Sequence, residues 1–332
     1  MSNVQTLTVA SSDDNIRIDR WFKKHFPQIS HGRLQKWLRT GQVRLDGGRV
    51  KAASRVREGQ SVRVPPLPDS DGPAPKRSER SREVAPETSK ALRESILYRD
   101  DDVIVINKPA GLAVQGGSGV KEHLDGYLDA LRLGAPERPR LVHRLDKETS
   151  GVLLLARTAQ ASRWLTAAFR GRDARKLYWA VVAGVPQPEE GIIDAPLDKR
   201  GGAGMEKMRV VERGEGQKAQ SVYRRIVSAG RVASWVAMEP LTGRTHQLRV
   251  HAAEVLGTPI IGDGKYGGEG AFIDSDQVAK GMHLHARAIR VPAPGGRIIE
   301  AEAPLPAHMV ATFAFFGFQT AEAEPGFLDY AG

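Results

Sequence analysis

The 332-residue sequence contains no cysteine. This absence excludes both a disulfide framework and a metal site built on thiolates. A reducing compartment fits such a composition, so we expect a cytoplasmic protein. The first 15 residues, MSNVQTLTVASSDDN, lack a basic start followed by an apolar stretch, and no secretory signal is expected.

Long apolar runs are also missing. The longest span a few residues, far short of the roughly 20 that a membrane helix requires, so we expect no membrane partner. Apolar residues still make up 40% of the chain, which is enough for a packed globular protein. A chain of this length suits two or three compact units.

Acidic side chains are scarce in one segment. Residues 17–63 hold 13 basic and only 3 acidic side chains, and this excess equals the net charge of +10 of the whole chain. An ordinary charged surface mixes the two signs, whereas an excess confined to one short module is typical of a domain that binds a polyanion. The charge pattern therefore favours a nucleic-acid partner.

The basic segment has the pattern of two short helices and a hairpin. Four large apolar residues recur at helical spacing and predict the first helix: Ile18, Trp21, Phe22 and Phe26. Ser30 is suited to cap a second helix that Gly41 ends, and alternating residues with an Asp-Gly-Gly turn follow. Arg33, Lys36 and Arg39 are expected on the outer face of the second helix, and Arg44 adds a cation in the strand that follows. We expect residues 1–64 to be an RNA-binding domain.

Residues 65–90 differ in composition from the rest of the chain. They are rich in proline, serine and charge, with hardly a large apolar side chain. Such a segment cannot bury enough surface to become ordered, so we predict a disordered linker. A second domain is expected over residues 91–332.

Short strands outnumber helices in this second domain. Apolar patterns predict strands at residues 103–106, 152–155, 177–183, 222–227 and 234–238, and helices at 159–169 and 245–256. Because the two kinds of element do not alternate regularly, we predict a mixed α+β domain with a largely antiparallel sheet.

The stretch HRLDKETSG, residues 143–151, places Asp146 between Arg144 and Lys147. If LVHRLD is extended, Arg144 and Asp146 project from the same face. A neighbouring guanidinium favours the ionised form of a carboxylate, as a nucleophile requires. Asp146 is therefore a candidate catalytic residue, although a simple cap of the KETSG turn is equally compatible with these residues.

Two further stretches contain candidate substrate-binding residues. In ARKLYWAVVAG, Tyr178 lies opposite Leu177 and Trp179 on a strand, and its ring suits stacking on an extruded base. A half-buried strand tyrosine is the alternative. In GRTHQLRVH, Arg249 falls between apolar residues of a predicted helix and needs an acidic partner, for which Asp146 is the candidate.

Some suggestive patterns lack their required context. The stretch GDGKYG matches G-x-G-x-x-G, but no helix follows to receive a pyrophosphate. His246 and His251 are five residues apart, which departs from the spacing of a helical zinc pair. We therefore expect neither a dinucleotide site nor a metal site.

Together these stretches resemble the RluA-type pseudouridine synthases. HRLDKETSG resembles the catalytic motif of that family, RKLYWAVVAG its tyrosine motif, and GRTHQLRVHAAEVLGTPIIGDGKYG its third, basic motif. The basic segment is similar to the S-four-type RNA-binding module, and NKPAGLAVQGGSG to a stretch of the RluC branch. The resemblance spans roughly residues 17–304.

The resemblance implies a pseudouridine synthase fold and isomerisation of uridine in large-subunit ribosomal RNA, without a cofactor. It implies that Asp146 acts on the ribose, by attack on the anomeric carbon or by removal of a neighbouring sugar proton. Arg249 would pair with Asp146, Tyr178 would stack on the uracil, and Arg144 would fill the place of a flipped base. The implied partner is ribosomal RNA or a pre-ribosomal particle, with no DNA, and the implied state is a monomer.

Two other functions fit the residues. A non-catalytic RNA chaperone or assembly factor would explain the basic module and linker. An RNA N-glycosidase that releases uracil would also place a carboxylate near an anomeric carbon.

Overall fold

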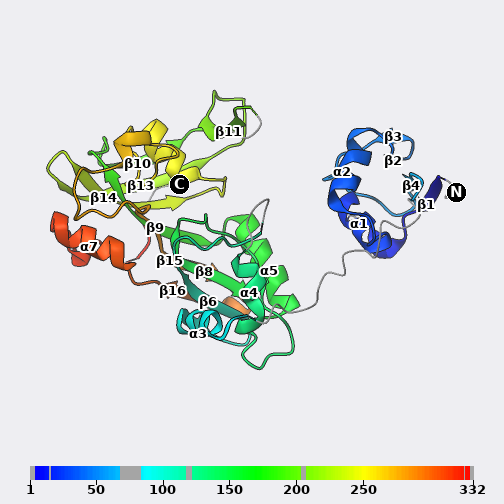
Figure 1. Cartoon of the computed structure of the whole chain (residues 1–332), viewed down its shortest axis with the longest axis horizontal. Coiled ribbons are helices and arrows are strands. Elements are labelled where there is room, and N and C mark those ends of the chain that lie inside the picture. Colours follow the sequence, from blue (N-terminus) through cyan, green and yellow to red (C-terminus); the bar gives the residue numbers. More distant parts are fainter. Residues whose placement is uncertain are drawn as a thin grey trace. The chain divides into compact units, whose positions relative to one another are not determined.

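The computed structural model describes residues 4–14, 16–67, 84–116, 122–202, 207–324 and 326–329 (Figure 1). The chain divides into two compact units, residues 1–81 and residues 82–332. Each described part has its own hydrophobic core. Within the described residues, no helix is long and apolar enough to cross a membrane.

The N-terminal unit packs two helices against a small antiparallel sheet. The helices are α1 (Ile18–His25) and α2 (His31–Arg39). The strand order is β1 (Gln5–Thr8), β4 (Ser61–Val64), β2 (Arg44–Leu45) and β3 (Gly48–Arg49). Ser30 caps α2, because its side chain accepts a hydrogen bond from the Arg33 amide. Ile18, Trp21 and Phe22 are completely or almost completely buried, so one face of α1 is anchored in the core.

The predicted linker differs from the structure at its C-terminal boundary. Residues 68–83 of that segment lie outside the described residues. Helix α3 (Pro86–Glu94) begins before residue 90, so the last residues of the disordered linker expected over 65–90 belong to a helix. Pro86 fits the first turn of a helix, and Leu92 anchors this helix in the core of the second unit.

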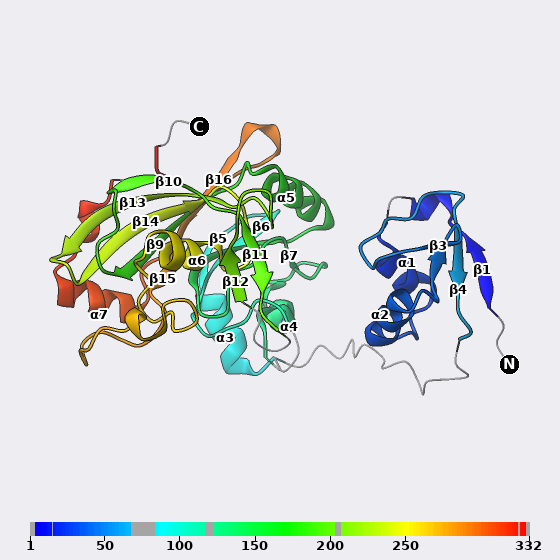
Figure 2. The ribbon, with the colours of Figure 1, turned by 90° about the horizontal axis from the view of Figure 1, so that it is seen from above.

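Among the described residues, the second unit is built on a ten-stranded sheet (Figures 1 and 2). Its main order is β10 (Glu190–Asp194), β13 (Gln220–Ala229), β14 (Ala233–Pro240), β9 (Arg175–Ala183), β15 (Leu284–Pro292), β8 (Ser150–Ala156), β6 (Val103–Lys108) and β5 (Ile96–Arg99). Strand β16 (Ile298–Glu302) pairs with β15, and β7 (Arg140–Leu141) pairs with β8. A separate two-stranded sheet is made by β11 (Leu197–Arg200) and β12 (Lys207–Val210).

Helices cover both faces of the large sheet (Figure 2). Residues of α3, α4 (Leu124–Tyr127) and α6 (Gln247–Val250) pack on one face. Helices α5 (Ala159–Gly171) and α7 (Ala307–Phe316) pack on the other. Along β9, Tyr178 belongs to the first face, and Leu177 and Trp179 to the second, as the sequence predicted. The mixed α+β architecture of this domain is confirmed.

The two halves of the sheet join at a parallel pairing of β8 with β15; the other described pairings of this sheet are antiparallel. At the junction Ser150 pairs with His285, and their side chains lie 2.8 Å apart. Gly151 has φ +107°, and a Cβ there would lie 2.2 Å from the carbonyl oxygen of Ala286. A glycine is therefore required directly behind the loop that contains Asp146.

Candidate active site

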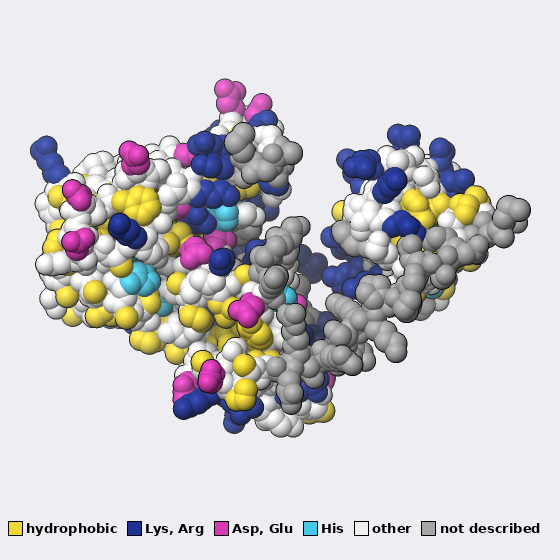
Figure 3. Space-filling view, in the orientation of Figure 1, with side chains coloured by type: hydrophobic (Ala, Val, Ile, Leu, Met, Phe, Trp, Pro, Cys, Tyr) yellow, Lys and Arg dark blue, Asp and Glu magenta, His cyan; other side chains and the backbone are white. Residues whose placement is uncertain are grey.

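A cavity of about 310 Å³ lies where the loop before β8 meets β9 and α6. Its lining includes the four residues that the motifs of the second domain singled out: Arg144, Asp146, Tyr178 and Arg249. It also includes Lys176 and His246, to which the sequence analysis gave no site role. Figure 3 shows basic, acidic and histidine side chains gathered closely on one face of this unit. The structure thus brings the three motifs together.

The Asp146 carboxylate faces two nitrogen-bearing side chains. Arg249 Nη1 lies 3.4 Å from Oδ2, and His246 Nε2 lies 3.8 Å from Oδ1. The Asp146 side chain retains 21% of its exposure, so its oxygens remain accessible from the cavity. Arg249 therefore places a positive charge directly beside this carboxylate.

The chain before Asp146 is less regular than the sequence predicted. Strand β7 ends at Leu141, so LVHRLD is not a continuous strand. His143 leaves the ladder because its Nε2 accepts a hydrogen bond from the Leu154 amide and its ring stacks on Phe169. Burial lowers the pKa of His143 to about 3, which keeps the ring neutral and able to accept. Leu145 is buried and Arg144 is exposed, so the expected alternation of the side chains persists.

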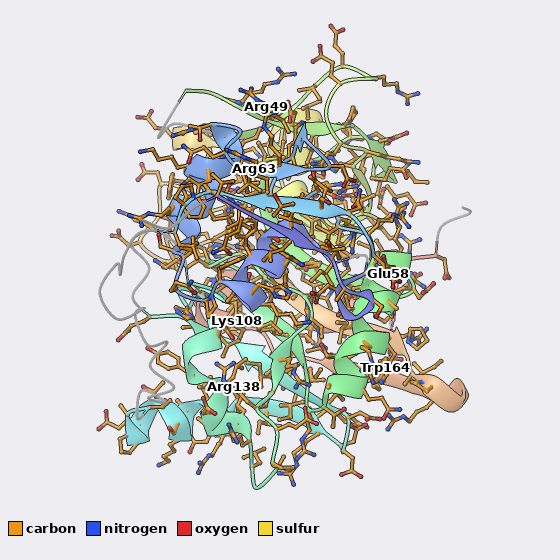
Figure 4. All side chains as sticks on the ribbon, turned by 90° about the vertical axis from the view of Figure 1, so that its right-hand side faces the viewer. Arg49, Glu58, Arg63, Lys108, Arg138 and Trp164 are labelled. Atoms are coloured by element: carbon orange, nitrogen blue, oxygen red, sulfur yellow. The ribbon has the colours of Figure 1, made fainter. Side chains whose placement is uncertain are left out.

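Lys108, labelled in Figure 4, contacts the loop of Asp146 through the carbonyl oxygen of Lys147. Its ammonium is buried and donates hydrogen bonds to the carbonyl oxygens of Pro109 at 2.7 Å, Leu112 at 2.9 Å and Lys147 at 3.1 Å. Burial lowers the pKa of Lys108 to about 8. No role was predicted for Lys108 from the sequence. A lysine at the end of a buried apolar strand was the available signal.

Replacing Lys108 by Met is expected to lower the free energy of unfolding by about 2–3 kcal/mol, because three partly buried carbonyl groups lose their charged donor. Amide hydrogen exchange at residues 146–149 should become faster at the same time. Urea unfolding and exchange mass spectrometry measure both effects. The control is Lys90→Met, an exposed lysine of α3 whose loss should change stability by less than about 0.5 kcal/mol. Equal effects of the two substitutions would contradict the supporting role.

Arg249 has a closer partner than Asp146. Its Nε and Nη2 donate to the two carboxylate oxygens of Asp263, each at 2.7 Å. Burial disfavours the charged form of Arg249, but the pairing with Asp263 outweighs it and raises the pKa of the guanidinium. The expected contact with Asp146 exists, but it is the longer one. Asp263 lies in the GDGKYG stretch, where no sequence spacing linked it to Arg249.

His246 occupies a strained position beside the carboxylate. Its φ is +54°, in the left-handed region that non-glycine residues rarely adopt. Its Nδ1 lies 2.6 Å from the Tyr266 hydroxyl, so the ring is held with Nε2 toward Asp146. Burial lowers the pKa of His246, and the charge of Asp146 opposes that shift. The structure therefore adds His246 and Tyr266 to the residues around Asp146.

Tyr178 closes the apolar side of the cavity. It retains 9% of its exposure and packs with Leu145 and Leu284 in one hydrophobic cluster. Burial, together with the charge of Asp146, raises the pKa of its hydroxyl. The ring therefore offers a flat apolar surface, and the hydroxyl keeps its proton at neutral pH.

The N-terminal cations lie in the other unit. Lys36, Arg39 and Arg44 are exposed, whereas Arg33 is partly buried. The Arg44 side chain donates to the carbonyl oxygens of Gly41 and Gly47, which holds it against the hairpin. Arg49 and Arg63, labelled in Figure 4, lie on β3 and β4 and enlarge the basic set. Figure 3 shows many lysine and arginine side chains on this unit.

The cavity therefore combines an accessible carboxylate, a fixed cation, a neutral hydroxyl and an apolar floor. Its volume suits a small planar group. In the part of the chain that the structure describes, no cluster of three or more histidine, aspartate or glutamate side chains is placed to hold a metal ion.

Comparisons with known proteins decide the family. A family model described as RNA pseudouridylate synthase matches residues 102–254. The ribosomal large subunit pseudouridine synthase C of Vibrio cholerae is 34% identical over 93% of this chain and 95% of its own length. The mitochondrial RNA pseudouridine synthase 4 of Arabidopsis thaliana is 34% identical over 92% of this chain and 81% of its own length.

The chain belongs to the RNA pseudouridylate synthase family. Among solved structures, human RNA pseudouridylate synthase domain containing 4 superposes with a TM-score of 0.58 at 32% identity. That match covers 69% of this chain and 95% of the human chain. The protein is thus a pseudouridine synthase acting on RNA, and the sheet described above is the pseudouridine synthase fold. Asp146, Tyr178 and Arg249 fall within the range of the family model, whereas Asp263 lies beyond it.

Proposed function

We propose that this pseudouridine synthase isomerises specific uridines of large-subunit ribosomal RNA, with Asp146 acting on the ribose of a flipped-out nucleotide. One observation carries the catalytic part: Asp146 lies in the cavity within 3.4 Å of Arg249 and on the same lining as Tyr178. The substrate part is supported by relatives from Vibrio cholerae and Escherichia coli that are named ribosomal large subunit pseudouridine synthase C, each 34% identical.

The reaction rearranges one nucleotide without adding or removing atoms. The glycosidic C–N bond breaks, the uracil turns, and a C–C bond to the same sugar carbon forms. No cofactor or metal is required for this balance. Asp146 either attacks the anomeric carbon or removes a neighbouring sugar proton, and both routes start from an ionised carboxylate. Arg249, held by Asp263, keeps a positive charge beside that carboxylate.

The uracil is proposed to lie against Tyr178. An aromatic ring stacks on a base whatever its orientation, so the uracil can turn without losing this contact. Because the pKa of Tyr178 is raised, the hydroxyl retains its proton at neutral pH and is available as a donor to the base. We propose that the same group assists proton transfer when the base regains its aromaticity.

The target base must leave the RNA stack, which costs a few kcal/mol. Arg144 is exposed at the cavity and is proposed to fill the vacated place. Residues 1–64 are proposed to act as an S-four-like domain that adds phosphate contacts through Arg33, Lys36, Arg39 and Arg44. We propose a cytoplasmic monomer that acts on ribosomal RNA or on a pre-ribosomal particle.

Mapping pseudouridines in ribosomal RNA from cells with and without the gene tests this function. Pseudouridine is expected to disappear at a small set of large-subunit positions and to return with the wild-type gene. An unchanged large-subunit pattern would contradict the proposed substrate. In vitro, isomerised nucleotide at unchanged RNA mass is expected, whereas free uracil would indicate an N-glycosidase. An RNA chaperone would instead require residues 1–64 and be insensitive to substitution of Asp146.

A further inference from the structure

Lys176 is a partly buried cation that the mechanism above does not use. It lies on β9 two residues before Tyr178, so both side chains project from the same face of the sheet, about 6.6 Å apart along the strand. Its side chain lines the cavity that contains Asp146. Burial is the main influence on Lys176, and it lowers the pKa of the ammonium.

The carboxylate whose charge acts on Lys176, Glu239, already has other partners. Glu239 accepts hydrogen bonds from Arg175 Nε at 3.1 Å and Nη2 at 2.9 Å, and also from the Leu328 amide. Among the described residues, Lys176 makes neither an ion pair nor a hydrogen bond within the distances of such contacts. A cation that is partly withdrawn from water and lacks a protein partner is costly, so this position favours binding of an anion.

Lys176 also lines a second cleft that continues from the first. This cleft has a volume of about 560 Å³ and shares Phe169, Lys176, Thr242 and Arg244 with the cavity of Asp146. Its outer wall has two exposed arginines, Arg170 and Arg172. The cleft also contains the carboxylate Glu239, which is paired with Arg175, so cations outnumber acids on the path that leads out of the cavity past Lys176.

We propose that Lys176 binds the phosphodiester adjoining the isomerised uridine and that the second cleft receives the flanking nucleotide. This inference rests on the proposed function. Uracil and ribose are uncharged at neutral pH, so the phosphodiester is the anion that an RNA substrate brings to an unpaired ammonium. With the base on Tyr178 and the sugar at Asp146, the backbone of the same nucleotide reaches Lys176. The site thus holds the nucleotide by its base, its sugar and its phosphate, and these three contacts limit how deeply the nucleotide enters the cavity.

Three variants of the full-length chain separate this role from others. Lys176→Met removes the charge and keeps the apolar stem. Lys176→Arg keeps a charge that does not deprotonate, so it preserves phosphate binding and abolishes any proton transfer. Lys280→Met removes a lysine from an exposed position outside both clefts and serves as the control for net charge.

Binding to a large-subunit ribosomal RNA fragment is measured over a range of salt concentrations. Lys176→Met is expected to weaken binding by about 10- to 100-fold and to reduce the log–log salt slope by about 0.7. Lys176→Arg should retain most of the affinity and the activity, and Lys280→Met should retain both. In a further series of RNA fragments, one phosphodiester at a time is replaced by a neutral methylphosphonate. One such replacement should weaken binding by the wild type but have little further effect on binding by Lys176→Met.

Wild-type RNA affinity in Lys176→Met would overturn the phosphate site. It would also be overturned if the loss of binding free energy in Lys176→Met simply added to the loss from every methylphosphonate. Loss of activity in Lys176→Arg with binding intact would also overturn it and would indicate proton transfer. The binding readout does not depend on catalysis. Suppose that binding of the ribosomal RNA fragment depends on one phosphodiester and on Lys176, but that the wild type never isomerises a uridine in it. This result would contradict the proposed function and would still support the phosphate site.

Discussion

Asp146→Asn is expected to slow pseudouridine formation by about 10⁴-fold or more while changing RNA affinity by less than about threefold. Asparagine has the same shape but carries no negative charge, so it neither attacks the anomeric carbon nor removes a sugar proton. The fold should be retained, because Arg249 keeps its closer pairing with Asp263. Single-turnover conversion of a ribosomal RNA fragment measures the rate, and a filter-binding titration measures the affinity.

The matched control for this experiment is Glu148→Gln. Glu148 is in the same loop, has a side chain that is 52% exposed, and loses the same charge. Its rate should stay within about threefold of the wild type, because exposed charges interact weakly. Conversion by Asp146→Asn at the rate of this control would mean that another group performs the chemistry.

Asp263→Ala is expected to lower the free energy of unfolding by about 3–5 kcal/mol. Asp263 is 2% exposed and Arg249 is 8% exposed, so the substitution leaves a guanidinium buried without its bidentate partner. The protein that remains folded should also form pseudouridine more slowly, because Arg249 is no longer fixed beside Asp146. Urea unfolding measures the stability, and single-turnover kinetics measures the rate.

Two further variants make the test of Asp263 specific. Asp274→Ala removes an exposed carboxylate and should change stability by less than about 0.5 kcal/mol. The double variant Asp263→Ala with Arg249→Met removes both charges and should regain stability without regaining activity. If Asp263→Ala matched Asp274→Ala in stability, the pair would not be a structural anchor.

The largest part of the fold that the sequence predicted is the sheet of the second unit. Alternation in β9 assigned Tyr178 and Leu177 to opposite faces, and the two residues lie in different hydrophobic clusters. Period-two alternation is a local property of a strand, so it can be read without knowing what the strand packs against. The same reasoning failed for LVHRLD, where His143 bonds to the Leu154 amide and ends the strand early.

The partners of the site residues were harder to predict. Arg249 was expected to pair with Asp146, yet Asp263 takes the bidentate position. Lys108 reaches the carbonyl oxygen of Lys147, which is 39 residues away in sequence. Such contacts depend on which segments the sheet brings together. The residue pattern within one segment does not show which distant segment it will contact.

By itself, the sequence determined the basic character of the N-terminal segment, the α+β class of the second domain and the three stretches that carry Asp146, Tyr178 and Arg249. Composition and alternation are properties of neighbouring residues, so they are readable along the chain. Only the tertiary structure decided that Asp263 holds Arg249 and that Lys176 has no carboxylate partner among the residues that the structure describes. Both depend on burial and on distances between strands, which arise when the two halves of the sheet join.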